Sequence, residues 1–148
     1  MTERFGKRLL IRPYEGFTRT FAWQGSGDPA TVRRIFAACL RATDWGCHSI
    51  YEGRIYRCPQ SIYIPRLVPD RPDAEEGLRI EDVRGFRQAL HAYLASPEPL
   101  WSCRYCLGTS GQEREHRLVT PKGWRDRHDQ TGEGLLAPGK LLPGASRT

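Results

Sequence analysis

Residues 46–58, with the sequence GCHSIYEGRIYRC, predict the central structural element of the chain. Strand-forming residues flank the dipeptide Glu52-Gly53, a pattern typical of a β-hairpin with a two-residue loop. In the register that this loop imposes, three pairs of residues face each other: Tyr51 and Arg54, Ile50 and Ile55, and Cys47 and Cys58. The Cα atoms of a hydrogen-bonded pair lie roughly 5.5 Å apart. We therefore expect both thiols on one face of the hairpin and both isoleucines packed on the other.

Helical patterns flank this hairpin on both sides. Asp28 followed by Pro29 is a typical helix start, because Asp caps free N–H groups and Pro is tolerated in the first turn. Apolar residues then repeat at helical spacing: Val32, Ile35, Phe36, Cys39 and Leu40. A second helix is predicted from about Glu81 to Ala95, with an apolar face formed by Val83, Phe86, Leu90 and Leu94. A hairpin, two helices and irregular loops give a small α+β domain.

The chain divides into three parts by composition. Residues 1–27 form a lead-in, with the apolar run at 9–11 as its expected strand. Residues 28–124 form the domain itself, in which a loop rich in Pro and Asp is expected at 65–77. Residues 125–148 are polar with recurring Gly and Pro, and they are expected to form a disordered tail.

Charge and hydropathy restrict the classes of partner. The net charge of +6 comes mostly from arginines scattered through every segment, which favours a solvated surface over a nucleic-acid interface. No window approaches 18 apolar residues, and the apolar run near the start is too short for a secretory signal. We therefore expect a cytoplasmic protein without a membrane partner.

The five cysteines carry the strongest chemical signal: Cys39, Cys47, Cys58, Cys103 and Cys106. Stable disulfides are rare in a reducing cytosol, so grouped cysteines indicate a metal site or catalysis. The spacing Cys103-Arg-Tyr-Cys106 lets two sulfurs turn toward one metal centre. Pro59 directly after Cys58 is typical of ferredoxin cluster motifs. Because structural zinc sites usually combine two close Cys pairs and only one occurs here, a 4Fe-4S cluster is favoured, with zinc as the alternative.

Two segments together resemble a known domain: Cys47-His-Ser-Ile-Tyr-Glu-Gly-Arg-Ile-Tyr-Arg-Cys58-Pro-Gln and, much later, Cys103-Arg-Tyr-Cys106-Leu-Gly. They resemble the C-terminal auxiliary-cluster domain of radical S-adenosylmethionine enzymes, in the short "twitch" form of the domain named SPASM. That family places a Gly shortly before a cluster cysteine at the end of a hairpin, then closes the site with Cys-x-x-Cys after a long insert. The resemblance covers roughly residues 30–118. It implies a 4Fe-4S cluster that transfers electrons or positions substrate.

Five cysteines compete for four ligand positions. Cys58, Cys103 and Cys106 are the expected metal ligands. The resemblance puts the first ligand about a dozen residues before the Gly, which selects Cys39, whereas the hairpin register favours Cys47. Cys39 also lies on the apolar helical face, where a small buried hydrophobe is equally expected. We prefer Cys47 slightly and keep Cys39 as its alternative.

The catalytic part of such an enzyme has no counterpart in this sequence. The family binds its catalytic cluster on Cys-x-x-x-Cys-x-x-Cys in a barrel, and that spacing does not occur here. Residues 1–27 have room for at most the last strand of a barrel. The resemblance therefore leaves three alternatives for this chain. It is a detached domain that completes a separate barrel protein, a degenerate remnant of such an enzyme, or the product of a misplaced start codon. No catalytic residue is predicted, and enzymatic activity stays open.

Arginines beside the expected ligands are the last feature of note. Arg54, Arg57 and Arg104 neighbour the cysteines and can offset the negative charge of a four-thiolate cluster. A solvated surface role is equally compatible with their positions.

Overall fold

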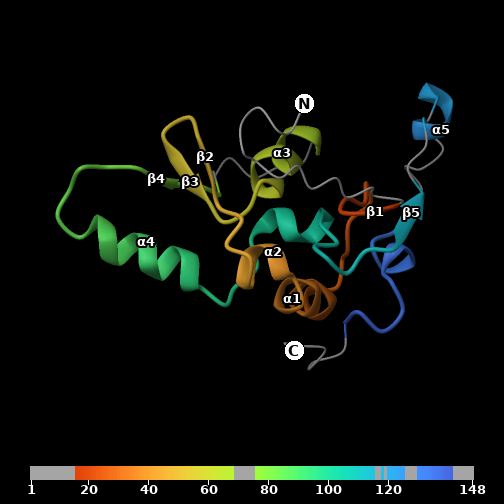
Figure 1. Cartoon of the computed structure of the whole chain (residues 1–148), viewed down its shortest axis with the longest axis horizontal. Helices are drawn as coiled ribbons and strands as arrows, with labels where there is room; N and C mark the ends of the chain where they lie inside the picture. The colour runs from red at the N-terminus through yellow and green to blue at the C-terminus, as the bar shows by residue number, and fades with distance from the viewer. Residues whose placement is uncertain (1–15, 69–75, 116–117, 119, 126–129, 142–148) are drawn as a thin grey trace, which may run out of the picture.

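The computed structural model describes residues 16–68, 76–115, 118, 120–125 and 130–141. The described chain contains, in order, β1 (Gly16–Thr18), α1 (Pro29–Ala37), α2 (Leu40–Thr43), β2 (Ser49–Tyr51), β3 (Arg54–Tyr56), α3 (Gln60–Leu67), β4 (Leu78–Arg79), α4 (Phe86–Ala95), η2 (Trp101–Tyr105), β5 (Glu113–Glu115), α5 (Pro121–Arg125) and η3 (Glu133–Leu135). Five α-helices, two 3₁₀ helices and two small sheets confirm the predicted α+β class (Figure 1). The predicted strand at 9–11 lies outside the described residues.

The hairpin has the predicted register. β2 and β3 are antiparallel, with Tyr51 opposite Arg54 and Ile50 opposite Ile55. Glu52 and Gly53 have φ values of 45° and 71°, as a tight turn with two left-handed residues requires. A third strand, β4, pairs with β3 and was not predicted.

Two details of the hairpin differ from the prediction. The ladder ends at the pair Ser49 and Tyr56, so Cys47 and Cys58 are not paired across it. Beyond that end the backbone N–H of Cys47 donates to the carbonyl of Arg41, 3.0 Å away. Ile50 is 72% exposed, so the expected packing of the isoleucine face was wrong at this residue.

The first predicted helix is confirmed at its start and is interrupted near its end. The Asp28 carboxylate accepts hydrogen bonds from the N–H groups of Ala30 and Thr31, and α1 buries Val32, Ile35 and Phe36. The helix stops at Ala37, Cys39 has extended backbone angles, and α2 follows. Thr109 supports this break, because its hydroxyl donates to the carbonyl of Ala38 and accepts from the N–H of Leu40.

Helix α3 begins at Gln60, two residues after Cys58, and was not predicted. It extends past Pro65, so the predicted loop at 65–77 begins later than expected. Ser61 on its first turn is fully buried, and its hydroxyl donates to the carbonyl of Cys58 at 2.7 Å. That contact holds the turn that joins the hairpin to α3.

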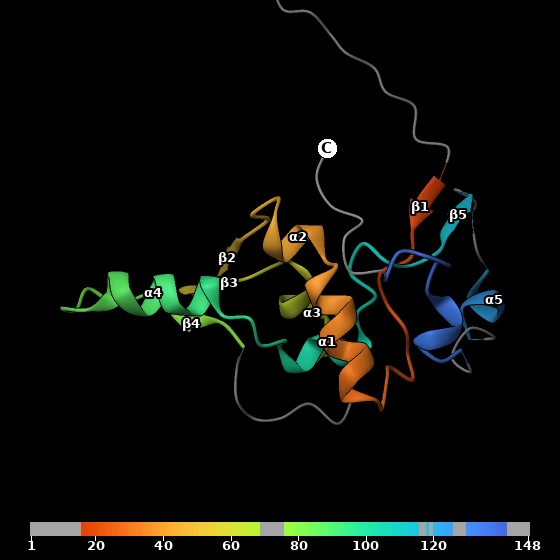
Figure 2. The ribbon, with the colours of Figure 1, turned by 90° about the horizontal axis from the view of Figure 1, so that it is seen from below.

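The second predicted helix is shorter than expected. α4 begins at Phe86, after Gly85 with a φ of 96°, rather than at Glu81. None of its residues is buried, and Val83 lies before it with 55% exposure. In both views α4 lies at one end of the molecule, beside β4 and away from α1 (Figures 1 and 2).

A small apolar cluster of Ala22, Leu107 and Leu135 closes the opposite end of the molecule. Residues 130–141 belong to the stretch expected to be a disordered tail, yet they pack here: η3 supplies Leu135, which is 2% exposed. Backbone bonds join this stretch to Gly25, Ser110 and Gln112. The rest of the expected tail, 126–129 and 142–148, lies outside the described residues. Among the described helices, none has the length and apolarity needed to cross a membrane.

Candidate metal centre

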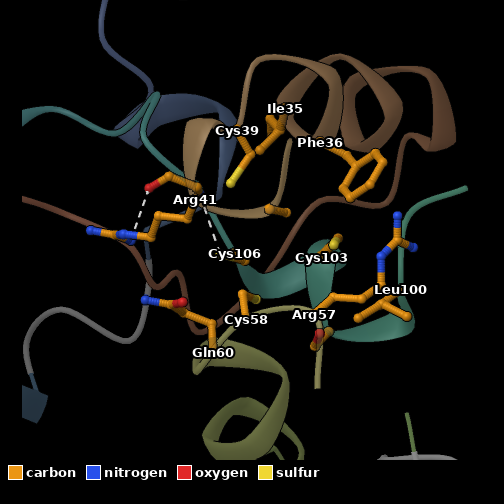
Figure 3. Close-up of a pocket in the computed structure, with 13 residues that line it drawn as sticks. Ile35, Phe36, Cys39, Arg41, Arg57, Cys58, Gln60, Leu100, Cys103 and Cys106 are labelled. Atoms are coloured by element: carbon orange, nitrogen blue, oxygen red, sulfur yellow. Dashed lines mark hydrogen bonds between the residues drawn. The ribbon is translucent and has the colours of Figure 1, made fainter. Parts of the chain in front are cut away.

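Four of the five cysteines line one cavity. They are Cys39, Cys58, Cys103 and Cys106, and they come from three separate segments of the chain (Figure 3). The remaining wall is largely apolar and includes Ile35, Phe36 and Leu100. Contacts of η2 with α1 and with α3 bring these segments together. The cavity therefore exists only because distant parts of the sequence pack around it.

Cys39 and Gly108 meet closely on one side of the cavity. The break between α1 and α2 places Cys39, which is 8% exposed, at the end of the buried helical face. Gly108 has a φ of 55°, and a Cβ atom added to it would lie 3.0 Å from the Cys39 Sγ. A side chain at residue 108 is thus disfavoured by both its backbone angle and the lack of space.

The Cys-x-x-Cys segment forms the tight knuckle that its spacing predicts. Cys103 lies in η2, and the backbone N–H of Cys106 donates to its carbonyl at 3.3 Å. The N–H of Gly108 donates to the Sγ of Cys106, also at 3.3 Å. This N–H···S bond favours a thiolate over a thiol at Cys106, because the anion is the better acceptor.

Burial opposes ionisation of these thiols. It is the largest cause that raises the pKa of Cys58 and of Cys103, and it raises the pKa of Cys106 to about 12. The neighbouring thiols add to the effect: Cys39 acts on Cys58 and on Cys106, while Cys106 acts on Cys103. A metal ion that binds these thiols would therefore have to displace their protons, because a metal ligand must be a thiolate.

Cys47 does not line the cavity. It is half-buried, beyond the end of the hairpin ladder, and it is bonded through its backbone to Arg41. The next residue, His48, forms a 3.1 Å hydrogen bond from its ring to the carbonyl of Arg57. The structure therefore groups Cys39 with the other three cysteines, and our preference for Cys47 does not fit this arrangement.

Among the described residues, the four thiols are not grouped as a ready-made site for a single ion. In the described part of the chain, no three His, Cys, Asp or Glu side chains form a group that can hold a single metal ion. All five cysteines are free of disulfides. The thiols thus share a cavity without converging on one point.

A polar network beside the cavity was missed by the sequence analysis. Arg57, which is 4% exposed, lines the cavity, and its backbone N–H donates to the hydroxyl of Tyr93. Tyr93 in turn donates to the backbone carbonyl of Glu76, whose carboxylate accepts from the N–H of Ser102. Burial raises the pKa of Glu76. Periodicity offers no signal for Glu76, because it lies within the expected loop rich in Pro and Asp.

Comparison with known proteins adds no family to this geometry. The sequence matches no model of a protein family, and no curated protein matches it significantly. The chemistry of the four-cysteine cavity is therefore the basis for any statement about function.

Proposed function

We propose that this protein binds a 4Fe-4S cluster through Cys39, Cys58, Cys103 and Cys106. The observation that carries the proposal is that these four cysteines, drawn from three segments, line one cavity. Thiolates are the usual ligands of such clusters, and hydrogen bonds to their sulfurs tune the bound cluster. The Gly108 N–H at the Cys106 Sγ is a bond of this kind.

The donor set fits a cluster better than zinc. Tetrahedral zinc holds its sulfurs at about 2.3 Å from the metal, which brings them within about 3.8 Å of one another. A structural zinc site therefore usually combines two close Cys pairs, and this chain has one, Cys103 and Cys106. In a four-iron cluster each thiolate binds a different iron, so the four sulfurs surround a larger body and lie further apart. The zinc-stabilised interaction module is therefore the weaker reading.

The resemblance to the auxiliary-cluster domain suggests the role of the site. Four cysteines occupy one coordination position on each of four irons, so no iron is left open to bind substrate. Such a cluster serves electron transfer, or it holds the shape of a domain that positions substrate. A radical S-adenosylmethionine barrel, on another polypeptide or elsewhere in the same protein, would supply the chemistry. The cytoplasm suits this proposal, because it keeps free thiols reduced.

The test is to load the purified chain with iron and sulfide in the absence of oxygen, and separately with zinc. We expect about four irons and four sulfides per chain with a broad visible absorption, as for cysteine-ligated clusters. Cys58→Ala should lose both the iron and the absorption. Zinc bound at one ion per chain, with no iron cluster formed on reconstitution, would overturn the proposal in favour of a structural zinc module.

A further inference from the structure

Arg57 places a buried positive charge at the wall of the four-cysteine cavity. It follows the hairpin and directly precedes Cys58, and it is 4% exposed. In the close-up its side chain lies beside Phe36, Leu100 and Cys103 (Figure 3). Unlike Lys, a guanidinium keeps its charge when it is buried.

The contacts of this guanidinium are neutral. One terminal nitrogen donates to the carbonyl of Glu98 at 2.7 Å, and the other donates to the carbonyl of Ser96. The guanidinium carbon lies 4.8 Å from the ring centre of Phe36 and 6.0 Å from that of Tyr93. These contacts fix the position of the group without cancelling its charge.

Arg57 forms no ion pair within 4.0 Å in the described part of the chain, although its charge acts on the buried carboxylate of Glu76. Among the described residues, the ion pairs within 4.0 Å involve other arginines and a lysine, and the buried Nε of Arg57 has no hydrogen-bond partner. Burial raises the pKa of Glu76 while the Arg57 charge lowers it, and one oxygen of this carboxylate is buried without a hydrogen-bond partner. A buried charge is costly unless an opposite charge accompanies it. An anion in the adjoining cavity would therefore stabilise this buried charge in addition to Glu76.

We propose that Arg57 is the positioning residue that raises the reduction potential of the cluster bound in this cavity; the inference rests on the proposed function. An oxidised 4Fe-4S core of charge +2 with four thiolates has a net charge of −2. It takes one electron from an external one-electron donor and becomes −3, and no bond or proton is exchanged. A fixed positive charge stabilises the reduced form more than the oxidised form, because the reduced form carries the larger negative charge. Net charge around the cluster is one of the determinants of its potential.

The experiment compares reduction potentials of loaded wild type, Arg57→Gln, Arg57→Lys and Arg104→Gln by anaerobic redox titration. Arg104 is the matched control, because it lies between two of the cysteines but is exposed, so water screens its charge. At a fixed applied potential, we expect Arg57→Gln to lower the ratio of reduced to oxidised cluster at least tenfold, a shift of about 59 mV for one electron. Arg57→Lys should keep the ratio of reduced to oxidised cluster close to that of wild type, because lysine retains the charge. Arg104→Gln should keep it within about twofold of wild type.

Several outcomes would overturn the inference. Equal shifts in Arg57→Gln and Arg104→Gln would mean that any lost charge has the same effect. A tenfold loss in Arg57→Lys would assign the effect to the lost contacts with Ser96 and Glu98 rather than to charge. If Arg57→Gln does not fold, Arg57→Lys decides alone: an unchanged ratio supports the inference and a tenfold loss overturns it. Wild type that takes up no cluster refutes the proposed function itself, whereas a normal cluster with an unmoved potential refutes this inference only.

Discussion

Two small buried regions, the four-cysteine cavity and the apolar cluster, receive side chains from consecutive residues. They differ in the interactions that can stabilise them. Cys106 lines the cavity of four thiols, whereas Leu107 belongs to the apolar cluster with Ala22 and Leu135. The backbone at Cys106 is extended, so successive side chains point to opposite sides. The apolar cluster is complete as it stands, since its three members are at most 2% exposed. The thiol cavity instead holds groups whose raised pKa values oppose the charge that ligation needs.

On the proposed function, hydrophobic burial and metal binding would each contribute to the stability of this one short chain. Burial of side chains such as Leu135 stabilises the fold whether or not a metal is bound. On the same proposal, the cavity would contribute fully only once a cation replaces the thiol protons, because metal-binding free energy would then add to folding free energy. Four changes separate the two contributions.

The largest effect is expected from the choice between Cys39 and Cys47. Cys39→Ser should abolish the stoichiometric cluster, because it removes a thiol from the cavity wall. Cys47→Ser is the matched control and should retain full iron content, since Cys47 lies outside the cavity. Iron and sulfide analysis after anaerobic reconstitution measures both. Loss of iron in Cys47→Ser with retention in Cys39→Ser would restore the preference drawn from the hairpin register.

The apolar interior is tested by Leu135→Ala. Deleting most of a fully buried leucine should lower the free energy of unfolding by about 2–4 kcal/mol. Denaturant unfolding of the loaded protein gives this value, and the iron content per folded chain should stay unchanged. If the cluster is lost along with the stability, the two interiors are one cooperative unit and the comparison fails.

Gly108→Ala acts at the boundary between the interiors. Alanine at a φ of 55° costs about 1–2 kcal/mol, and its Cβ would also press on the Cys39 Sγ. Gly53→Ala is the control, because its φ of 71° carries a similar backbone cost but nothing lies within 4 Å of the added Cβ. Both variants should lose folding stability, Gly108→Ala more because of its added contact with Cys39, and only Gly108→Ala should release iron faster to a chelator. Equal release rates would remove the steric role of Gly108.

The smallest effect is the pH dependence of the metal-free protein. Burial raises the pKa of Cys106 from its ordinary 9.0 to about 12, and it also raises that of Cys58 and Cys103. The folded state therefore holds these protons more tightly than the unfolded state, so this stability is complete below about pH 9 and is lost as the pH rises toward 12.

Thermal unfolding at pH 8 and pH 10 measures this effect. The melting temperature of the metal-free form should fall by a few degrees. The loaded form should change less, because iron has already replaced the protons. A metal-free melting temperature that is equal or higher at pH 10 would contradict the assignment of buried protonated thiols.

Several elements could be predicted because neighbouring residues specify them. The hairpin register follows from the turn at Glu52 and Gly53, whose left-handed backbone angles set which residues face each other. The start of α1 follows from the Asp28 cap, which satisfies N–H groups two and three residues away. The knuckle of Cys103 and Cys106 likewise needs only its own short segment.

Other features depend on residues that are distant in the sequence. Helical periodicity extends through Cys39, but the hydroxyl of Thr109 interrupts the helix there and turns the thiol into the cavity. The hairpin ladder ends before Cys47, and no local pattern indicates that it must. Glu76 and Leu135 have polar or irregular neighbours, so their burial could not be read from periodicity.

Local sequence therefore accounts for the elements, and for the presence of cysteines suited to a metal centre. Hydrogen bonds and packing between segments account for which four cysteines share a cavity and for the buried charge of Arg57 beside them. The physical reason is the sequence distance over which each kind of interaction acts. A turn or a cap is satisfied by groups a few residues away, whereas burial and electrostatic environment sum over every segment that surrounds a side chain.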